Sequence, residues 1–361
     1  MFRKPAVLAL LLLVAATANA SFFVVPPDDD MIDEAQAIVI GTIRESYGAF
    51  DIYGRVQTTY RIEIEEVLKG SIDTRLPVHI RDMGGEVGSQ GMLVPEAAQY
   101  WGDNRALIFL DRDSDGWLRT YGLAIGKFDF VKDASGRQLS VRWLGQEDVA
   151  AYSPDGHPHE EKLRSSQEFI DYIRHRVAGQ ARRRPMTASK TAAVEAPVAN
   201  YFVEPVLPLE PTAAQKFIPK VDSHTPYPPT AYTSGTFRWK EFDSGGSISY
   251  RVSGSQPGLD SAGAASRALA AWTNDPESFI RLNNAGTTTA GFVGDGQNTI
   301  VFNSANDVPA GSIGYASYYF SSETHPYDGI TWRNMTEGDV VIKSNFTYGQ
   351  TILDEAVTHE V

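Results

Sequence analysis

Alternating apolar and polar positions mark a series of short strands between residue 35 and about residue 144. The alternation is clearest over residues 60–65, where a tyrosine and two isoleucines alternate with an arginine and two glutamates. A period of two is typical of a strand with one buried face. Similar short runs, separated by Gly, Asp and Asn turns, lie at 37–43, 78–81, 106–110, 117–121, 128–131 and 139–143. We therefore predict an all-β domain, a barrel or a sandwich, over residues 35–164, after an N-terminal segment of residues 21–34.

The spacing of apolar residues becomes helical after this domain and is then lost. Phe169, Tyr172 and Ile173 share one side of a helix predicted over residues 165–180. Residues 181–235 are rich in Pro, Ala and Thr and show no sustained period, so we predict an extended linker. The three arginines at 182–184 are interpreted as a solvated charge run, with a processing site as the alternative.

Strand and helix patterns alternate in the last region, residues 236–361. A helix capped by Asp260 or Ser261 is predicted to run to Asn274. Another helix is predicted from Thr351 onward, and its apolar stripe consists of Leu353, Val357 and Val361. Strands are predicted at 248–252, 298–303 and 339–345. This mixture indicates an α/β (α+β) fold for the third region.

The first twenty residues have the features of a secretion signal. Arg3 and Lys4 precede an apolar run over 6–16, and Ala18-Asn19-Ala20 forms an A-x-A cleavage site, so we predict a mature start at Ser21. The apolar run is shorter than the roughly 20 residues that cross a bilayer, and we predict no transmembrane anchor. The expected location is outside the cell, with a periplasm as the alternative.

Charge and cysteine usage narrow the classes of function. The formal net charge of −13 becomes −15 once Arg3 and Lys4 are removed with the signal, and such an acidic chain is a poor partner for nucleic acid. The sequence contains no cysteine. A thiol nucleophile and a cysteine-ligated zinc site are therefore excluded, and the domains must be stable through ordinary apolar cores.

The main candidate chemistry lies in the final predicted helix. His359 is followed directly by Glu360, which is the opening of the pattern H-E-x-x-H. In that pattern two His one helical turn apart bind one zinc ion, while the Glu takes a proton from the metal-bound water. The second His would be residue 363, so we expect the printed sequence to stop inside the motif.

The segments ahead of this dipeptide resemble a known enzyme family. In chain order they read ISYRVS, SRALAAWTNDPESFIRL, NTIVFNS, GSIGYASYYF, GDVVIKSNF and ILDEAVTHEV. Together they resemble the strands and helices of a metzincin catalytic domain, in particular of the matrixin branch, over about residues 236–361. The resemblance implies that His359 is the first ligand of a catalytic Zn²⁺ and that Glu360 is the general base. It also implies that the second and third ligands lie beyond Val361.

This resemblance further implies a protein or peptide substrate that lies extended along an edge strand of the sheet. The matching strand is 339–345, which makes Val340, Val341 and Ile342 the candidate substrate-binding residues; a buried strand is the plainer interpretation of the same run. Matrixin latency commonly uses a cysteine bound to the zinc, and this chain has none. If the precursor is latent, its N-terminal domain or linker must block the cleft instead.

A second resemblance concerns the all-β region. The order of AIVIGTI, a long strand ending in EEVLKG, and ALIFLDRD resembles the OB-type barrels related to netrin and metalloproteinase-inhibitor modules. Within it the residues Asp111, Asp113, Asp115 and Gly116 spell the beginning of a Ca²⁺ loop. Gly122 occupies the position of the bidentate acid that such a loop needs, so we predict a plain hairpin turn.

Two further groups of polar residues are interpreted as polar loops rather than metal sites. The first group consists of His157, His159 and Glu160, which lie beside Pro and Gly where helical spacing cannot operate. The second consists of His325 and Asp328, which resemble part of the structural-zinc loop of matrixins although the other expected ligands are missing.

Two hypotheses of function remain. The first is a secreted zinc-dependent metalloendopeptidase, present here as a precursor or fragment. The alternative is an exported, non-catalytic binding protein with a degenerate metzincin-like domain. An H-x-x-G-x-x-H continuation after Val361 would favour the enzyme, and a stop codon would favour the binding protein.

Overall fold

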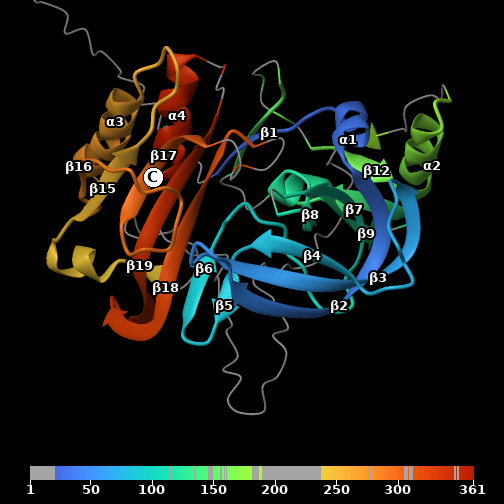
Figure 1. The fold of residues 1–361 in the computed structure, drawn as a ribbon, viewed down its shortest axis with the longest axis horizontal. Helices are drawn as coiled ribbons and strands as arrows, with labels where there is room; N and C mark the ends of the chain where they lie inside the picture. The colour runs from blue at the N-terminus through green and yellow to red at the C-terminus, as the bar shows by residue number, and fades with distance from the viewer. Residues whose placement is uncertain are drawn as a thin grey trace, which may run out of the picture.

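The computed structural model describes residues 21–361 except 114, 134, 145–148, 155, 156, 158, 160, 181–186, 189–236, 277, 305–307, 309–311, 345, 346 and 348. The described residues form a mixed α/β structure that consists mostly of strands, with two large sheets and four α-helices (Figure 1). The predicted secretion signal, the arginines at 182–184 and nearly all of the predicted linker lie outside the described residues. In the part of the chain that the structure describes, no helix is long and apolar enough to span a bilayer.

The first sheet closes on itself. Its ring strands are β2 (Ala37–Phe50), β3 (Val56–Lys69), β4 (Val78–Met83), β8 (Leu118–Thr120) and β7 (Arg105–Arg112). Each strand pairs with the next in that order, and β7 pairs again with β2. All of these pairs are antiparallel except the short parallel pair of β4 with β8 at Ile80 and Leu118. The five strands therefore form a closed ring.

Further strands extend the ring beyond β7. They are β9 (Lys127–Lys132), β10 (Gln138–Arg142), β12 (Leu163–Ser165) and β13 (Thr187–Ala188). Helix α2 (Ser166–Val177) follows β12 and buries Phe169 and Ile173, as its predicted apolar face requires. It ends three residues before the predicted boundary, where Gly179 adopts a φ of 68° that favours glycine.

The N-terminal segment 21–34 is ordered, although the sequence pattern indicated no element there. Strand β1 (Ser21–Val24) pairs in parallel with β11 (Val149–Tyr152), and helix α1 (Asp28–Glu34) buries Met31 and Ile32. A helix of seven residues presents only one apolar pair to the core, so it shows no detectable period. Three aspartates in its first turn favour the helix through its dipole.

The second sheet combines both ends of the chain. Its path runs through β16 (Leu282–Thr287), β15 (Ile248–Ser253), β17 (Asn298–Ser304), β19 (Ile330–Lys343), β18 (Gly314–Tyr327), β6 (Gln90–Leu93) and β5 (Gly85–Val87), with β14 (Phe237–Arg238) on β19. The pairs from β16 to β19 are parallel, and β18 is antiparallel to both β19 and β6. Two strands from the 35–164 region thus continue a sheet built mainly from residues 237–361, and Figure 1 shows β6 beside β18.

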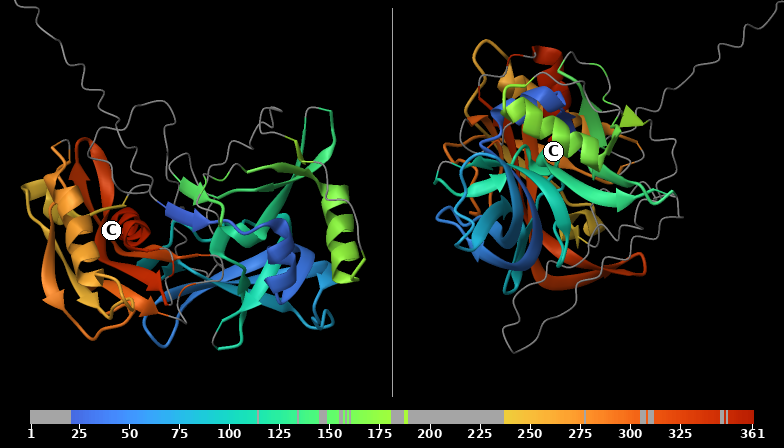
Figure 2. Two further views of the ribbon diagram at one scale, coloured as in Figure 1. Left: turned by 90° about the horizontal axis from the view of Figure 1, so that it is seen from above. Right: turned by 90° about the vertical axis from the view of Figure 1, so that its right-hand side faces the viewer.

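Two helices cover one face of the second sheet. Helix α3 (Ser261–Asn274) begins where the Asp260 side chain accepts a hydrogen bond of 2.9 Å from the backbone N–H of Gly263, and α4 (Gln350–Glu360) packs beside it. Both helices share an apolar core with Ile300, Val340 and Ile342 of the sheet. Figure 2 shows α3 and α4 at one end of the molecule and α2 at the other. The prediction of α3, including its cap, is confirmed.

The opposite face of the second sheet packs against the barrel. Val301, Tyr315 and Val341 belong to one apolar core with Leu107 and Phe109 of β7. Because side chains alternate across a strand, the same strands supply both cores. The barrel and the second sheet are consequently joined by a continuous apolar interior as well as by β6.

The expectation that Val340, Val341 and Ile342 lie on an edge strand is wrong. They lie in β19, which has β17 on one side and β18 on the other. All three side chains are buried, as expected of a central strand covered on both faces. The strand also begins nine residues earlier than predicted, because it forms a long hairpin with β18.

Candidate functional site

Helix α4 carries the candidate catalytic residues and is anchored mainly by apolar packing. Gly349, with a φ of 84°, precedes its first residue, and Leu353, Ala356 and Val357 are fully buried against the sheet core. On its outer side Asp354 forms an ion pair of 2.8 Å with Arg267 of α3. Leu353 and Val357 thereby confirm the predicted apolar stripe, and Val361 packs at its end.

His359 and Glu360 lie in the last turn of this helix, where two neighbours fix the backbone. The indole N–H of Trp272 in α3 donates a hydrogen bond of 2.9 Å to the carbonyl oxygen of Thr358. The hydroxyl of Tyr318 in β18 donates one of 3.2 Å to the carbonyl oxygen of Glu360. His359 is partly exposed, whereas the Glu360 residue is only 1% exposed. The turn is therefore held between a helix and the antiparallel strand of the sheet.

Two carboxylates near this turn also affect the pKa of Tyr318. Burial raises its pKa well above the usual value, and Tyr250 and then the negative charges of Glu360 and Glu96 raise it further. Glu96 follows β6 in the barrel region and is buried. The structure thus brings a residue of the barrel region and the end of α4 close to the same hydroxyl. Sequence reasoning missed Tyr318 and Glu96, because neither belongs to a spaced motif.

Among the described residues, the candidate zinc ligands expected from the resemblance reduce to His359. A catalytic zinc uses three protein ligands in general, and His359 offers one imidazole nitrogen. Across the described ranges, no group of three or more His, Cys, Asp or Glu is arranged to hold a metal ion. The fit to a zinc ion therefore extends to a single ligand and the adjacent carboxylate of Glu360.

The histidine-rich segment near residue 159 leads into a buried ion cluster. His159 lies 2.9 Å from a carboxylate oxygen of Glu161, which also pairs with Arg142 at 2.7 Å and Arg164 at 2.6 Å. Burial alone would raise the pKa of Glu161, but the charge of Arg142, the His159 hydrogen bond and the charge of Arg164 hold it well below its usual range. The cluster ties β10 and β12 together. Glu160 lies outside the described residues, and the His157 backbone carbonyl accepts a hydrogen bond from Ser153.

His325 and Asp328 occupy different parts of a tight hairpin, one in a strand and the other in the turn. Asp328 and Gly329 form the two-residue turn between β18 and β19, with φ values of 49° and 75°. Two positive φ values are typical of a type I′ turn, for which Asp-Gly is a favoured pair. His325 lies in β18, is 6% exposed, and pairs with Asp243 at 3.0 Å and with Asn334. The HPYDG segment is a strand end and a turn.

The candidate calcium loop is a hairpin turn, as predicted. Asp113 accepts hydrogen bonds from the backbone N–H groups of Asp115 (3.0 Å) and Trp117 (2.8 Å), and Gly116 has a φ of 83°. This turn connects β7 to β8. Asp133 makes equivalent bonds in the turn between β9 and β10, accepting from Ser135 and Arg137. The repeated geometry is that of a side-chain-capped turn.

A buried carboxylate pair lies in β19, and sequence reasoning did not find it. Glu337 accepts hydrogen bonds from the backbone N–H groups of Asp295 (3.2 Å) and Gly296 (2.8 Å), and Asp339 accepts one of 2.9 Å from Thr299. Burial, with lesser contributions from neighbouring carboxylates, raises the pKa of Glu337 to about 7 and that of Asp339 to about 9. Two close carboxylates in a buried site share a proton.

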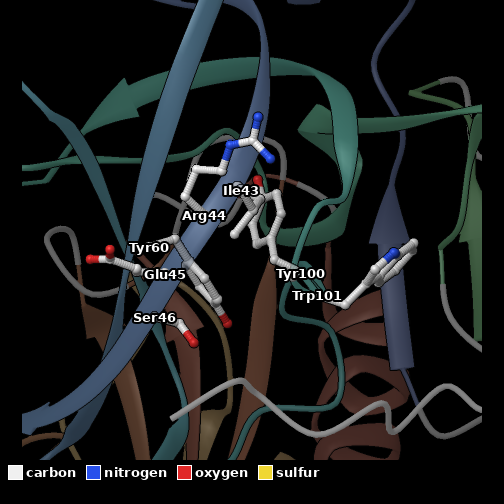
Figure 3. A pocket seen from close by; sticks show the side chains of 8 residues that line it. Ile43, Arg44, Glu45, Ser46, Tyr60, Tyr100 and Trp101 are labelled. Atoms are coloured by element: carbon white, nitrogen blue, oxygen red, sulfur yellow. The ribbon is translucent and has the colours of Figure 1, made fainter. Parts of the chain in front are cut away.

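A small hollow on the barrel surface is too narrow for a ligand. Figure 3 shows the tyrosine rings of Tyr60 and Tyr100, whose centroids lie 4.8 Å apart, with Arg44 above them. Arg44 pairs with Glu63 at 2.7 Å. The walls leave no room for a water molecule. The side chains here pack against one another on the barrel surface.

Comparisons with protein-family models, with curated proteins and with solved structures found no match to this chain.

Proposed function

We propose that this chain contains the first part of a metzincin-type, matrixin-like zinc endopeptidase, with His359 as the first zinc ligand and Glu360 as the general base. The observation that carries the proposal is the position of His359-Glu360 in the last turn of a helix packed under a mostly parallel sheet. The described residues of the segments quoted for the resemblance lie in regular elements or next to them. In chain order these elements are β15, α3, β17, β18, β19 and α4.

The chemistry proposed for the two residues follows from their types and places. Zinc, when bound, lowers the pKa of its water towards 7 and polarises the peptide carbonyl. The imidazole of His359 would hold the metal, and the adjacent Glu360 would accept the proton of the attacking water. The hydrogen bonds to the carbonyl oxygens of Thr358 and Glu360 support this, since they hold the turn that orients both side chains.

The proposed substrate is an extended peptide that pairs with β18. The resemblance predicts an edge strand at 339–345, but β18 is the strand that lies antiparallel at the margin of the parallel part of the sheet. Backbone hydrogen bonds along such a strand give affinity for any sequence, and side-chain pockets add selectivity. Tyr318 links this strand to Glu360, so a peptide on β18 would pass near the end of α4.

The barrel supports the second resemblance. Its ring of β2, β3, β4, β8 and β7, with one parallel contact between the third and fourth strands, is compatible with an OB-type barrel of five strands. We propose that the region is an exported module that accompanies the peptidase, either outside the cell or in a periplasm.

The experiment requires a protein extended beyond Val361 through H-x-x-G-x-x-H. We expect this protein to bind one zinc ion per chain and to cleave peptides. Glu360→Gln should keep the zinc and lose roughly 100-fold or more of kcat, because the amide cannot accept a proton. Glu355→Gln is the matched control, since Glu355 is exposed on the same helix. Equal activity of Glu360→Gln and Glu355→Gln would overturn the assignment.

The alternative of a non-catalytic binding protein has one specific observation in its favour. Strand β6 already pairs with β18 in this chain, so the strand proposed to receive the substrate is covered. If the gene ends at Val361, or if the extended protein binds no zinc, the binding protein becomes the better reading. Zinc content by atomic emission decides this before any activity is measured.

A further inference from the structure

Strand β6 occupies the outer edge of β18. The pairing is antiparallel, with Tyr318 opposite Leu93, Tyr319 opposite Met92, Phe320 opposite Gly91 and Ser321 opposite Gln90. Beyond this register the backbone N–H of Ser322 donates a hydrogen bond of 2.7 Å to the carbonyl oxygen of Ser89. The hairpin of β5 and β6 therefore forms the backbone contacts that an added peptide strand would form.

The pairing lies beside the candidate catalytic turn. Tyr318, opposite Leu93, is the residue whose hydroxyl donates to the carbonyl oxygen of Glu360. Leu93 packs with the core beneath α3 and α4, whereas Met92 packs with the barrel core. Because side chains alternate along a strand, Leu93 lies on the α4 face of the sheet. A substrate side chain at this place would face the same helix.

The fit between the hairpin and its partner strands is specific. A Cβ atom on Gly91 would lie 2.1 Å from a ring carbon of Phe320, so a larger residue at this position of β6 fits only if that ring or the strand moves. Glu86 of β5 forms an ion pair of 2.7 Å with Arg333 of β19, and the guanidinium of Arg333 lies 4.3 Å from the centroid of the Phe320 ring. The Glu86–Arg333 ion pair and the Gly91–Phe320 contact are therefore neighbours, because Arg333 lies over the ring of Phe320.

The hairpin is an addition to the barrel and not one of its ring strands. It lies between β4 and β7 in sequence, and the ring closes through β4, β8 and β7 without it. Its base is held by the Thr58 hydroxyl, which donates a hydrogen bond of 2.7 Å to the carbonyl oxygen of Gly84. Displacing β6 from β18 would therefore leave the barrel ring paired.

We propose that the β5–β6 hairpin, residues 85–93, is an internal occupant of the peptide-binding edge of β18 and keeps the site closed to outside peptides. The proposal rests on the proposed function in calling β18 the substrate strand. The partner that fits this edge is an extended peptide with a glycine or a shallow side chain opposite Phe320. Such a closure does not use a thiol, and the chain has no cysteine.

The first test measures binding to the chain as printed. The probe is a fluorescently labelled peptide with the sequence of residues 84–95, followed by anisotropy. Gly91→Leu should release β6 and bind this peptide about tenfold or more tightly than the unmodified chain, because an edge that is free more of the time gives a lower apparent Kd. Gly291→Leu is the matched control, since a Cβ there meets nothing within 4 Å. A scrambled peptide should bind neither variant.

A second variant covers the case in which Gly91→Leu does not fold. Glu86→Arg places a cation against Arg333 and should also increase peptide binding, by a smaller factor. Amide hydrogen exchange on residues 318–322 should accelerate in whichever variant folds, while β2 and β3 keep their protection. Tight peptide binding by the unmodified chain, or no gain in either folded variant, would overturn the proposal.

The second test separates this inference from the proposed function. In the protein extended through H-x-x-G-x-x-H, Gly91→Leu should raise kcat/KM for a peptide substrate about tenfold or more, while Gly291→Leu should leave it unchanged. An active extended protein with no response to Gly91→Leu means that the closure is wrong and the peptidase assignment stands. An extended protein without zinc or activity means that the function is wrong, and peptide binding alone then decides whether β6 covers the edge.

Discussion

The phenolic hydroxyl of Tyr318 lies 3.2 Å from the carbonyl oxygen of Glu360 and donates a hydrogen bond to it. This contact joins the strand that carries β6 to the turn that carries the candidate catalytic residues. A carbonyl at a helix C-terminus has no partner within the helix, so the bond satisfies a group that would otherwise need water. The position of α4 is thereby coupled to β18.

Removing this hydroxyl should weaken the fold modestly. We expect Tyr318→Phe to lower the free energy of unfolding by about 1 kcal/mol, because one hydrogen bond of a half-buried group is lost and the ring remains. Urea unfolding followed by tryptophan fluorescence measures the difference. Tyr47→Phe is the control, since Tyr47 is 42% exposed. Equal stability of the two variants would show that the bond does not hold α4 in solution.

The ion cluster of Glu161, Arg142 and Arg164 should make the barrel region sensitive to loss of one charge. Glu161→Gln leaves the guanidinium of Arg142, whose side chain is fully buried, without its carboxylate partner. Breaking a buried pair in this way costs about 3–5 kcal/mol. Thermal unfolding should show a large loss for Glu161→Gln and a small one for Glu63→Gln, whose side chain is 61% exposed.

The same cluster predicts that the stability of the chain falls in acid. The folded-state pKa of Glu161 is depressed, so its contribution to stability is present above the ordinary value of 4.5 and is lost as pH falls through the folded pKa. Denaturant midpoints measured from pH 6 down to pH 3 should therefore fall in the unmodified chain. The Glu161→Gln chain should show a shallower fall over that range, and parallel curves would contradict the assignment.

The Glu337 and Asp339 pair predicts that the stability of the chain falls as the pH rises. Both folded-state pKa values are raised, to about 7 and about 9, from ordinary values of 4.5 and 3.8. Their favourable contribution is complete below the ordinary values and is lost as pH rises through the folded ones. Stability should fall between pH 5 and pH 9 in the unmodified chain and fall less in Asp339→Asn. Asp115→Asn, in an exposed turn, should not change the slope.

The sequence predicts those helices and strands whose apolar pattern lies within one short segment of the chain. Helix α3 has its cap and its face within residues 260–274. Strand β15 alternates apolar and polar residues, and β17 contains a short continuous apolar run. The β18–β19 hairpin was missed because polar and aromatic residues fill its far half, where the strands leave the core. Its one local signal was Asp328-Gly329, the pair that favours a type I′ turn.

The covered edge of β18 could not be predicted from local sequence. Strand β6 has four residues, and its partner lies in the other half of the chain. A glycine such as Gly91 can indicate that another group lies close to the backbone, but the sequence alone does not identify that group as the ring of Phe320. Glu96 follows β6, so this long-range pairing brings it near Tyr318, whose hydroxyl contacts the end of α4 from β18. By contrast, the sequence singles out His359 and Glu360 as candidates, because they open a metal motif and follow the ordered segments that carry the resemblance.

The segment between the two regions should be the first site of proteolysis. Residues 181–235 are rich in Pro, Ala and Thr, and such a composition buries too little apolar surface to offset chain entropy. Brief treatment with trypsin should cut there before it cuts within 35–144. Mass spectrometry of the fragments, with N-terminal sequencing to test the start at Ser21, identifies the sites. First cuts inside 35–144 would contradict the predicted boundary.

The zinc prediction distinguishes His359 from Glu360 in the candidate catalytic turn by the property that each variant should lose. In a protein extended through H-x-x-G-x-x-H, His359→Ala removes one of three ligands and should weaken zinc binding by about 100-fold or more, and with it the peptidase activity. Glu360→Gln should leave zinc binding near its original value, because a general base does not coordinate the metal. Competition with a chromogenic chelator measures both affinities. Equal zinc affinity in the two variants would mean that His359 is not a ligand, whatever the activity of either protein.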